Sequence, residues 1–204
     1  MALKFANNQS LTNTTALPSA VPTDNLILIS TQTASNSANI SFTTGLNGTY
    51  DVYEFKFIDI HPRTDSVTFD FNLSTDSGSN YNVTKTTTFF RAYHNEADNS
   101  EGLGYDANKD LAQSTSFQIL MVDIGNGADE SASGTLTLFN PSSTTYVKHF
   151  IADTNSYRSD DLCYSSKIAG YGNTTSAVNA IRFQMSSGNF DGIIKLYGVK
   201  KSWV

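Results

Sequence analysis

Hydrophobic and polar residues alternate along much of this chain, with the period of two that is typical of half-buried β-strands. The segment SVTFDFNL at 66–73 is the clearest case, because every second residue is apolar and the residues between are polar. Such segments recur at the short intervals expected of a β-sandwich. They cover residues 26–33, 38–43, 50–60, 66–73, 83–93, 116–124, 134–140, 146–152, 179–186 and 192–199.

These segments predict an all-β fold, an antiparallel β-sandwich of jelly-roll type with about eight to ten strands. The last two segments predict a terminal hairpin, because Ser187-Gly188-Asn189 between them is a turn signal. Residues 74–82 and 94–106 are rich in turn formers and are expected to be loops. One short helix is expected at most, within 106–113.

The aromatic residues divide into two groups. One group lies at inward strand positions and is expected in the core: Phe55, Phe57, Phe69, Phe71, Phe139, Phe150 and Phe183. The other lies in or beside polar segments: Tyr81, Tyr93, Tyr105, Tyr157, Tyr164 and Tyr171. A tyrosine offers an apolar ring and a hydroxyl, so Tyr93, Tyr105, Tyr157 and Tyr171 are candidates for ligand or interface contacts. The alternative is that they pack within their own loops.

Residues 1–25 differ from the rest of the chain and are expected to form an N-terminal arm, with 26–204 as a single sandwich domain. The arm is polar, and its spaced apolar residues would dock onto a neighbouring subunit or another protein: Leu3, Phe5, Leu11 and Leu17. A frayed terminus, or an arm folded back on its own domain, is the alternative.

Composition narrows the class of protein. Charged residues make up 16% of the chain and the net charge is −6, which argues against a nucleic-acid surface built from Lys and Arg. No apolar run reaches the length of a membrane span, and the first residues lack the apolar core of a secretory signal. We therefore expect no nucleic acid and no membrane as partners, and synthesis in a cytoplasm.

Motifs for catalysis or metal binding are weak. Cys163 is the single cysteine, and the three histidines show no metal-ligand spacing. The segment DANKDL at 106–111 begins like a calcium loop but has Leu111 where glycine is required. Asp129 and Glu130 on a glycine-rich loop are unspecific oxygen-ligand candidates. We expect no cofactor, no metal and no catalytic residues, and a protein that is not an enzyme.

Several segments taken together resemble a family of small proteins encoded by marine tailed bacteriophages of the cyanophage and pelagiphage type. They are MALKFANNQS, LISTQTASNSANISFTTGLNGTYDVYEFKFIDIHP, LFNPSSTTYVKHF and GYGNTTSAVNAIRFQMSSGNFDGIIKLYGVK. The closing SSGNFDGIIKLYG also resembles, more loosely, a pattern in phage tail and fibre proteins. The resemblance spans residues 1–200 and brings no catalytic motif with it.

The resemblance implies a virion structural protein, located in the virion and made in the host bacterium. One role is decoration or cementing of the capsid or tail by a homo-oligomer, a trimer being one form, in contact with other virion proteins. The alternative is a receptor- or glycan-binding module of a head or tail fibre, which would take a host surface glycan.

Overall fold

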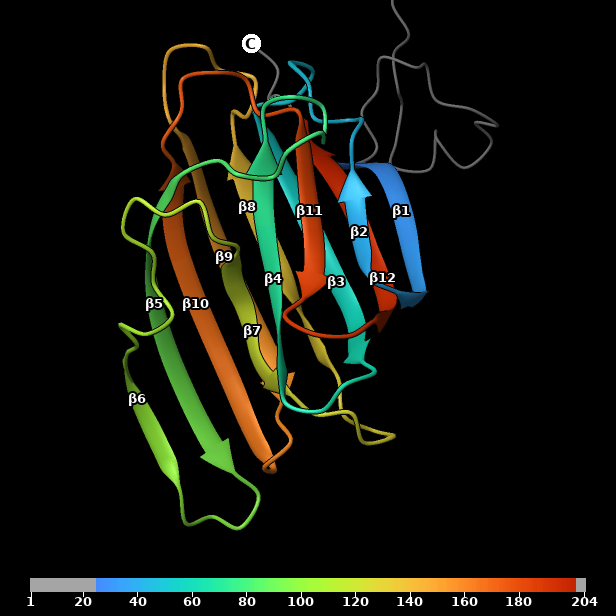
Figure 1. Cartoon of the computed structure of the whole chain (residues 1–204), viewed down its shortest axis with the longest axis vertical. Helices are drawn as coiled ribbons and strands as arrows, with labels where there is room; N and C mark the ends of the chain where they lie inside the picture. The colour runs from blue at the N-terminus through green and yellow to red at the C-terminus, as the bar shows by residue number, and fades with distance from the viewer. Residues whose placement is uncertain (1–24, 201–204) are drawn as a thin grey trace, which may run out of the picture.

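The computed structural model describes residues 25–200 and shows two antiparallel β-sheets packed face to face (Figure 1). The large sheet has eight strands in the order β1-β12-β3-β8-β9-β10-β5-β6, and the small sheet has four in the order β2-β11-β4-β7. The arm residues Leu3, Phe5, Leu11 and Leu17 lie outside the described residues. The predicted all-β antiparallel sandwich is therefore confirmed, whereas its jelly-roll connectivity stays a prediction.

Twelve strands occur between residues 25 and 200, more than the eight to ten expected. Their bounds are β1 Leu26–Ser37, β2 Asn39–Phe42, β3 Val52–Pro62, β4 Val67–Ser74, β5 Lys85–Asn95, β6 Glu101–Tyr105, β7 Gln118–Ile124, β8 Ala132–Phe139, β9 Lys148–Tyr157, β10 Leu162–Gly172, β11 Ala180–Met185 and β12 Phe190–Val199.

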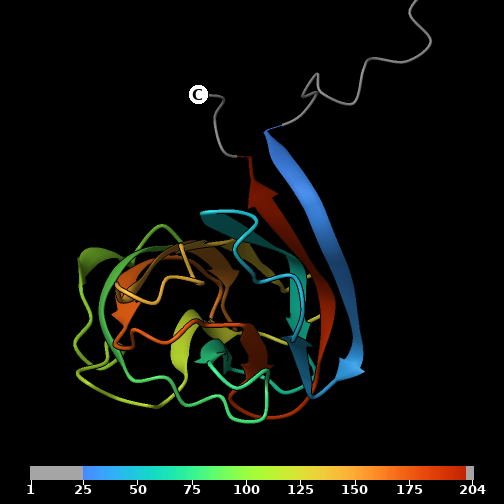
Figure 2. The same cartoon turned by 90° about the horizontal axis from the view of Figure 1, so that it is seen from above.

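The core lies between the two sheets, which appear as separate layers in Figure 2. Phe183 on β11 is at its centre and is fully buried. Five other phenylalanine rings surround it, with centroids 5.1–6.4 Å away: Phe42, Phe55, Phe57, Phe69 and Phe71. These rings come from both sheets, so the aromatic cluster joins the two layers.

The predicted terminal hairpin is wrong. The chain does bend between Ser186 and Asn189, where Gly188 has a φ of +72°. However, β11 pairs with β2 and β4 in the small sheet, whereas β12 pairs with β1 and β3 in the large sheet. The bend therefore crosses from one layer to the other. An alternating pattern shows that a strand has one buried face but does not show which strand it pairs with.

Two of the observed strands, β6 and β10, depart from what the sequence predicts. Residues 106–113 form turns and bends, and the segment expected as a loop at 94–106 contains β6. The strand β10 was not predicted at all, because its inward positions include serine and glycine in place of large apolar residues. No helix long and apolar enough to cross a membrane occurs within residues 25–200.

Candidate binding groove on the outer face of the large sheet

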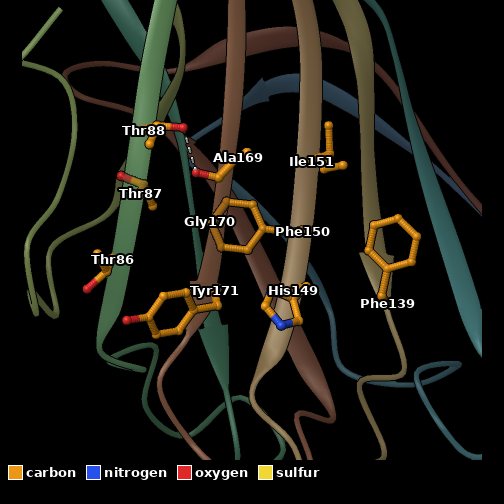
Figure 3. Close-up of a pocket in the computed structure, with 10 residues that line it drawn as sticks. All are labelled: Thr86, Thr87, Thr88, Phe139, His149, Phe150, Ile151, Ala169, Gly170 and Tyr171. Atoms are coloured by element: carbon orange, nitrogen blue, oxygen red, sulfur yellow. Dashed lines mark hydrogen bonds between the residues drawn. The ribbon is translucent and has the colours of Figure 1, made fainter.

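An open groove of about 470 Å³ lies on the outer face of the large sheet, across four neighbouring strands (Figure 3). Strand β5 contributes Thr86, Thr87 and Thr88, β8 contributes Phe139, and β9 and β10 contribute the rest: His149, Phe150, Ile151, Ala169, Gly170 and Tyr171. The strands that meet here come from sequence segments up to about 85 residues apart (86 to 171).

Strand register explains why this part of the face is hollow. Ala169 lies between Thr88 on β5 and Ile151 on β9, so a short side chain separates two longer ones. The side chains of Thr87 and Phe150 point into the core and are buried, so these residues do not rise above the floor of the groove. A low floor between raised side chains produces the groove.

One end of the groove is formed by two rings. Tyr171 on β10 is paired directly with His149 on β9, and their ring centroids are 6.1 Å apart at an angle of 61°. Figure 3 shows the two rings side by side, with Phe139 on the far side of His149. Of the four candidate tyrosines, only Tyr171 lines this groove.

Phe139 is a correction to the predicted core. It follows Leu136 and Leu138, which point inward and are fully buried, so Phe139 has the opposite orientation and lies half-buried on the outer face. The alternation in this strand already contains that information, because an odd-numbered residue here shares its face with Thr137. The other six phenylalanines expected in the core are buried there.

The chemistry of the groove is neutral and suited to binding. Its lining contains no acidic side chain and no Lys or Arg. The Thr88 hydroxyl donates to the Ala169 carbonyl at 3.3 Å, and the Thr86 hydroxyl accepts from the Gln113 side chain at 2.7 Å. Rings that can stack, together with hydroxyl and imidazole groups, suit a neutral polyhydroxylated ligand. The groove itself holds no carboxylate pair for glycoside hydrolysis.

Two smaller hollows continue along the same face. One, of about 200 Å³, lies among Phe90, Ala92, Leu103 and Lys167, and the other, of about 260 Å³, lies beside Tyr157 and Cys163. The groove and the two smaller hollows together follow β10 from Tyr171 to Cys163, a length of roughly 26 Å at ~3.3 Å per residue. The Tyr157 hydroxyl donates to Glu96 at 3.1 Å, and this hydrogen bond raises the pKa of Tyr157 to about 12.

The remaining two candidate tyrosines lie elsewhere. Tyr93 is on β5 but on its inward face, where its ring stacks on Tyr164 with centroids 6.2 Å apart, so it packs against the core. Tyr105, at the end of β6, is exposed on the outer face and donates its hydroxyl to Asp110. Tyr93, Tyr105, Tyr157 and Tyr171 therefore lie in strands instead of loops and do not converge on one site.

The acidic candidates Glu130 and Asp106 make their contacts within the protein. Within residues 25–200 no group of three or more His, Cys, Asp or Glu side chains is arranged to hold a metal ion. Glu130 turns back and accepts a hydrogen bond from the backbone N–H of Gly127 in its own loop. Asp106 forms ion pairs with Arg91 at 3.3 Å and Lys109 at 3.4 Å.

No family model matches this chain, and no curated protein matches it.

Proposed function

We propose that the chain is a non-enzymatic structural subunit of a tailed-bacteriophage virion that decorates or cements the capsid or tail as an oligomer. The observation that carries this proposal is a patch of exposed apolar side chains on the outer face of β5 and β6, namely Phe90, Leu103 and Tyr105. Contiguous apolar surface of this kind marks a contact with another protein. The resemblance to marine phage proteins supports the same role.

A binding experiment tests this role. Purified full-length protein is mixed with phage particles that lack it and, separately, with host cells, and each mixture is sedimented. We expect the protein to sediment with particles and to remain in solution with cells. Protein that sediments with neither would overturn the structural role, and protein that sediments only with cells would favour the fibre role described next.

The same sedimentation experiment, carried out with a deletion variant, tests the predicted N-terminal arm. A variant that lacks residues 2–20 should retain the circular-dichroism spectrum of the β-sandwich but no longer sediment with particles. Normal incorporation of the variant would show that Leu3, Phe5, Leu11 and Leu17 do not anchor the protein.

The second candidate function is glycan binding by a head or tail fibre module, and the groove is the observation that favours it. Its aromatic and imidazole end, neutral lining and threonine hydroxyls suit a neutral host surface glycan. The two smaller hollows along β5, β9 and β10 would extend contact beyond a single sugar unit.

Calorimetric titration with purified host surface polysaccharide tests glycan binding. Tyr171→Ala and His149→Ala are each expected to weaken binding by about fivefold to 150-fold, because each removes about 1–3 kcal/mol of contact. Tyr197→Ala is the matched control, since Tyr197 lies on β12 of the same sheet and does not line the groove. Equal weakening by all three variants, or no binding by the unaltered protein, would contradict this function.

A further inference from the structure

The strand β6 leaves one edge of the large sheet unpaired. Within residues 25–200, β6 pairs only with β5. The backbone N–H of Asp106 donates to Phe89 and that of Asn95 donates to Ser100, which fixes the phase of this antiparallel ladder. Hydrogen-bonded pairs alternate with non-hydrogen-bonded pairs in such a ladder, so the backbone N–H and C=O groups of Gly102 and Gly104 point toward β5. The N–H and C=O groups of Glu101, Leu103 and Tyr105 therefore face the open edge.

This edge strand is five residues long and carries one charged side chain, Glu101, but it lacks the other features that keep sheet edges apart. Proteins protect edge strands with lysine, proline or β-bulges. The β6 sequence EGLGY contains no lysine or proline, and its register with β5 shows no irregularity. The opposite edge strand, β1, is different, because its register with β12 shifts between Leu28 and Ser30 and again between Ala34 and Ser37.

From these features we infer that β6 pairs antiparallel with β6 of a second copy of this chain, about a two-fold axis through Leu103. The sequence EGLGY is self-complementary in this register. Leu103 lies opposite Leu103 of the partner subunit, Gly102 lies opposite a glycine, and Glu101 lies opposite a tyrosine. No like charges face each other.

The pattern of hydrogen bonds between β5 and β6 is compatible with a two-fold axis through Leu103. The three residues whose backbone groups face the open edge are the ones that become closely bonded pairs, each with two hydrogen bonds. A two-fold axis through such a pair is the usual symmetry of a self-complementary contact. The inference depends on the phase of β6 and does not depend on the proposed role in a virion.

Side chains on both faces allow this approach. On the outer face Leu103 is 84% exposed, and Phe90 and Tyr105 are 48% and 47% exposed, so pairing brings two apolar patches together. On the inner face an added Cβ at Gly104 would meet no heavy atom within 4 Å, whereas one at Gly102 would lie 2.7 Å from the Tyr93 ring, so the inner face of β6 is open at Gly104 and covered by that ring at Gly102. Five residues a side give a small interface, which predicts a dimer of micromolar or weaker affinity.

Sedimentation velocity of the full-length protein over a range of concentrations tests the contact. We expect a monomer at low concentration and a dimer at high concentration. Leu103→Lys should abolish the dimer by placing two like charges face to face. Leu103→Pro should also abolish it, because proline removes an N–H that faces the open edge and leaves the bonds to β5 intact. Leu28→Lys, at an exposed leucine on the opposite edge, is the matched control and should still dimerise.

Cross-linking tests the register. In a Cys163→Ser background, Leu103→Cys places two thiols on residues whose Cα atoms are about 5.5 Å apart, so a short bifunctional maleimide should link the subunits. Glu101→Cys places the two thiols roughly 14 Å apart, four residues along the pair, and should link poorly. A monomer at all concentrations, a dimer that Leu103→Pro does not weaken, or equal linking at both positions would overturn the inference.

Discussion

At the scale of single residues, Asp70 is the clearest departure from what the alternating pattern suggests. It occupies a polar position of β4 but is only 8% exposed, and its Oδ1 atom has no hydrogen-bond partner among the described residues. Burial raises the pKa of Asp70 to about 6, and a hydrogen bond from Thr68 opposes this shift. Its cross-strand neighbours, Gln184 and Ile119, are uncharged, and among residues 25–200 no ion pair includes Asp70.

The raised pKa makes the free energy of unfolding depend on pH. Above the folded pKa of about 6 the carboxylate is charged in both states, and the folded state carries the full desolvation cost. Below the unfolded value of 3.8 the group is neutral in both states, so the cost disappears. Stability from this group therefore falls as pH rises from about 4 to 6, by up to about 3 kcal/mol.

Asp70→Asn should remove this dependence. We expect the variant to exceed the unaltered protein in free energy of unfolding by about 1–3 kcal/mol at pH 7.5 and by much less at pH 4. Urea denaturation at the two pH values measures the difference. Asp65→Asn, at an exposed carboxylate, is the control and should show little pH-dependent effect. A gain at pH 4 as large as that at pH 7.5 would contradict the assignment.

Lys85 is a second polar residue whose burial the alternating pattern does not predict. Its neighbours in the segment are threonines, and nothing in the sequence marks it as buried. In the fold it is fully buried, donates to Asn72 at 2.5 Å and Val83 at 2.9 Å, and has a pKa lowered to about 7 by burial. Alternation assigns a residue to a face of its own strand, but burial depends on what covers that face.

At the scale of elements, the sequence pattern located the strands with large alternating side chains and missed the others. The strand β6 has glycine at both of its inward positions, and β10 has Ser166, Gly170 and Gly172 among its inward positions. Their formation depends on backbone pairing: β6 pairs with β5, the preceding strand, and β10 pairs with β9, the preceding strand, and with β5, which is far away in sequence. Local hydrophobicity carries no record of such pairing.

The pairing of β12 with β3 contains a bulge that depends on Gly192. The register shifts between Asp191 and Ile193, and Gly192 has a φ of +140°, which side chains strongly disfavour. An added Cβ would lie 2.9 Å from the carbonyl oxygen of Asp59 and 3.1 Å from the Cα of Ile60. Backbone atoms cannot move away as easily as a flexible side chain.

We therefore expect Gly192→Ala to lower the free energy of unfolding by about 2 kcal/mol or more. Gly48→Ala is the matched control, because a Cβ there meets no heavy atom within 4 Å, and it should change stability by less than about 0.5 kcal/mol. Chemical denaturation of both variants measures these values. Equal effects of the two substitutions would show that the bulge tolerates a side chain.

At the scale of the whole molecule, the groove shows why the site could be predicted only in part. Tyr171 was a candidate from the sequence, but His149, Phe139 and the threonines of β5 were not. The face on which each lies follows from alternation within its own strand. Their proximity follows from the order β8-β9-β10-β5, which is set by long-range register.

The same long-range order makes the core a single unit. Phe183 contacts rings of Phe42 on β2, Phe55 and Phe57 on β3, and Phe69 and Phe71 on β4, so it connects both sheets. Removing it leaves a cavity that the surrounding strands cannot close without disturbing both layers. Both sheets should therefore lose stability together.

Phe183→Ala should lower the free energy of unfolding by about 3–5 kcal/mol. Far-ultraviolet circular dichroism and tyrosine fluorescence should report one coincident unfolding transition at a lower denaturant concentration. Phe90→Ala, studied at a concentration where the chain is monomeric, is the control, because half of Phe90 is already exposed and little burial is lost. Separate transitions in the two signals would show that the sheets unfold independently, contrary to a core shared through Phe183.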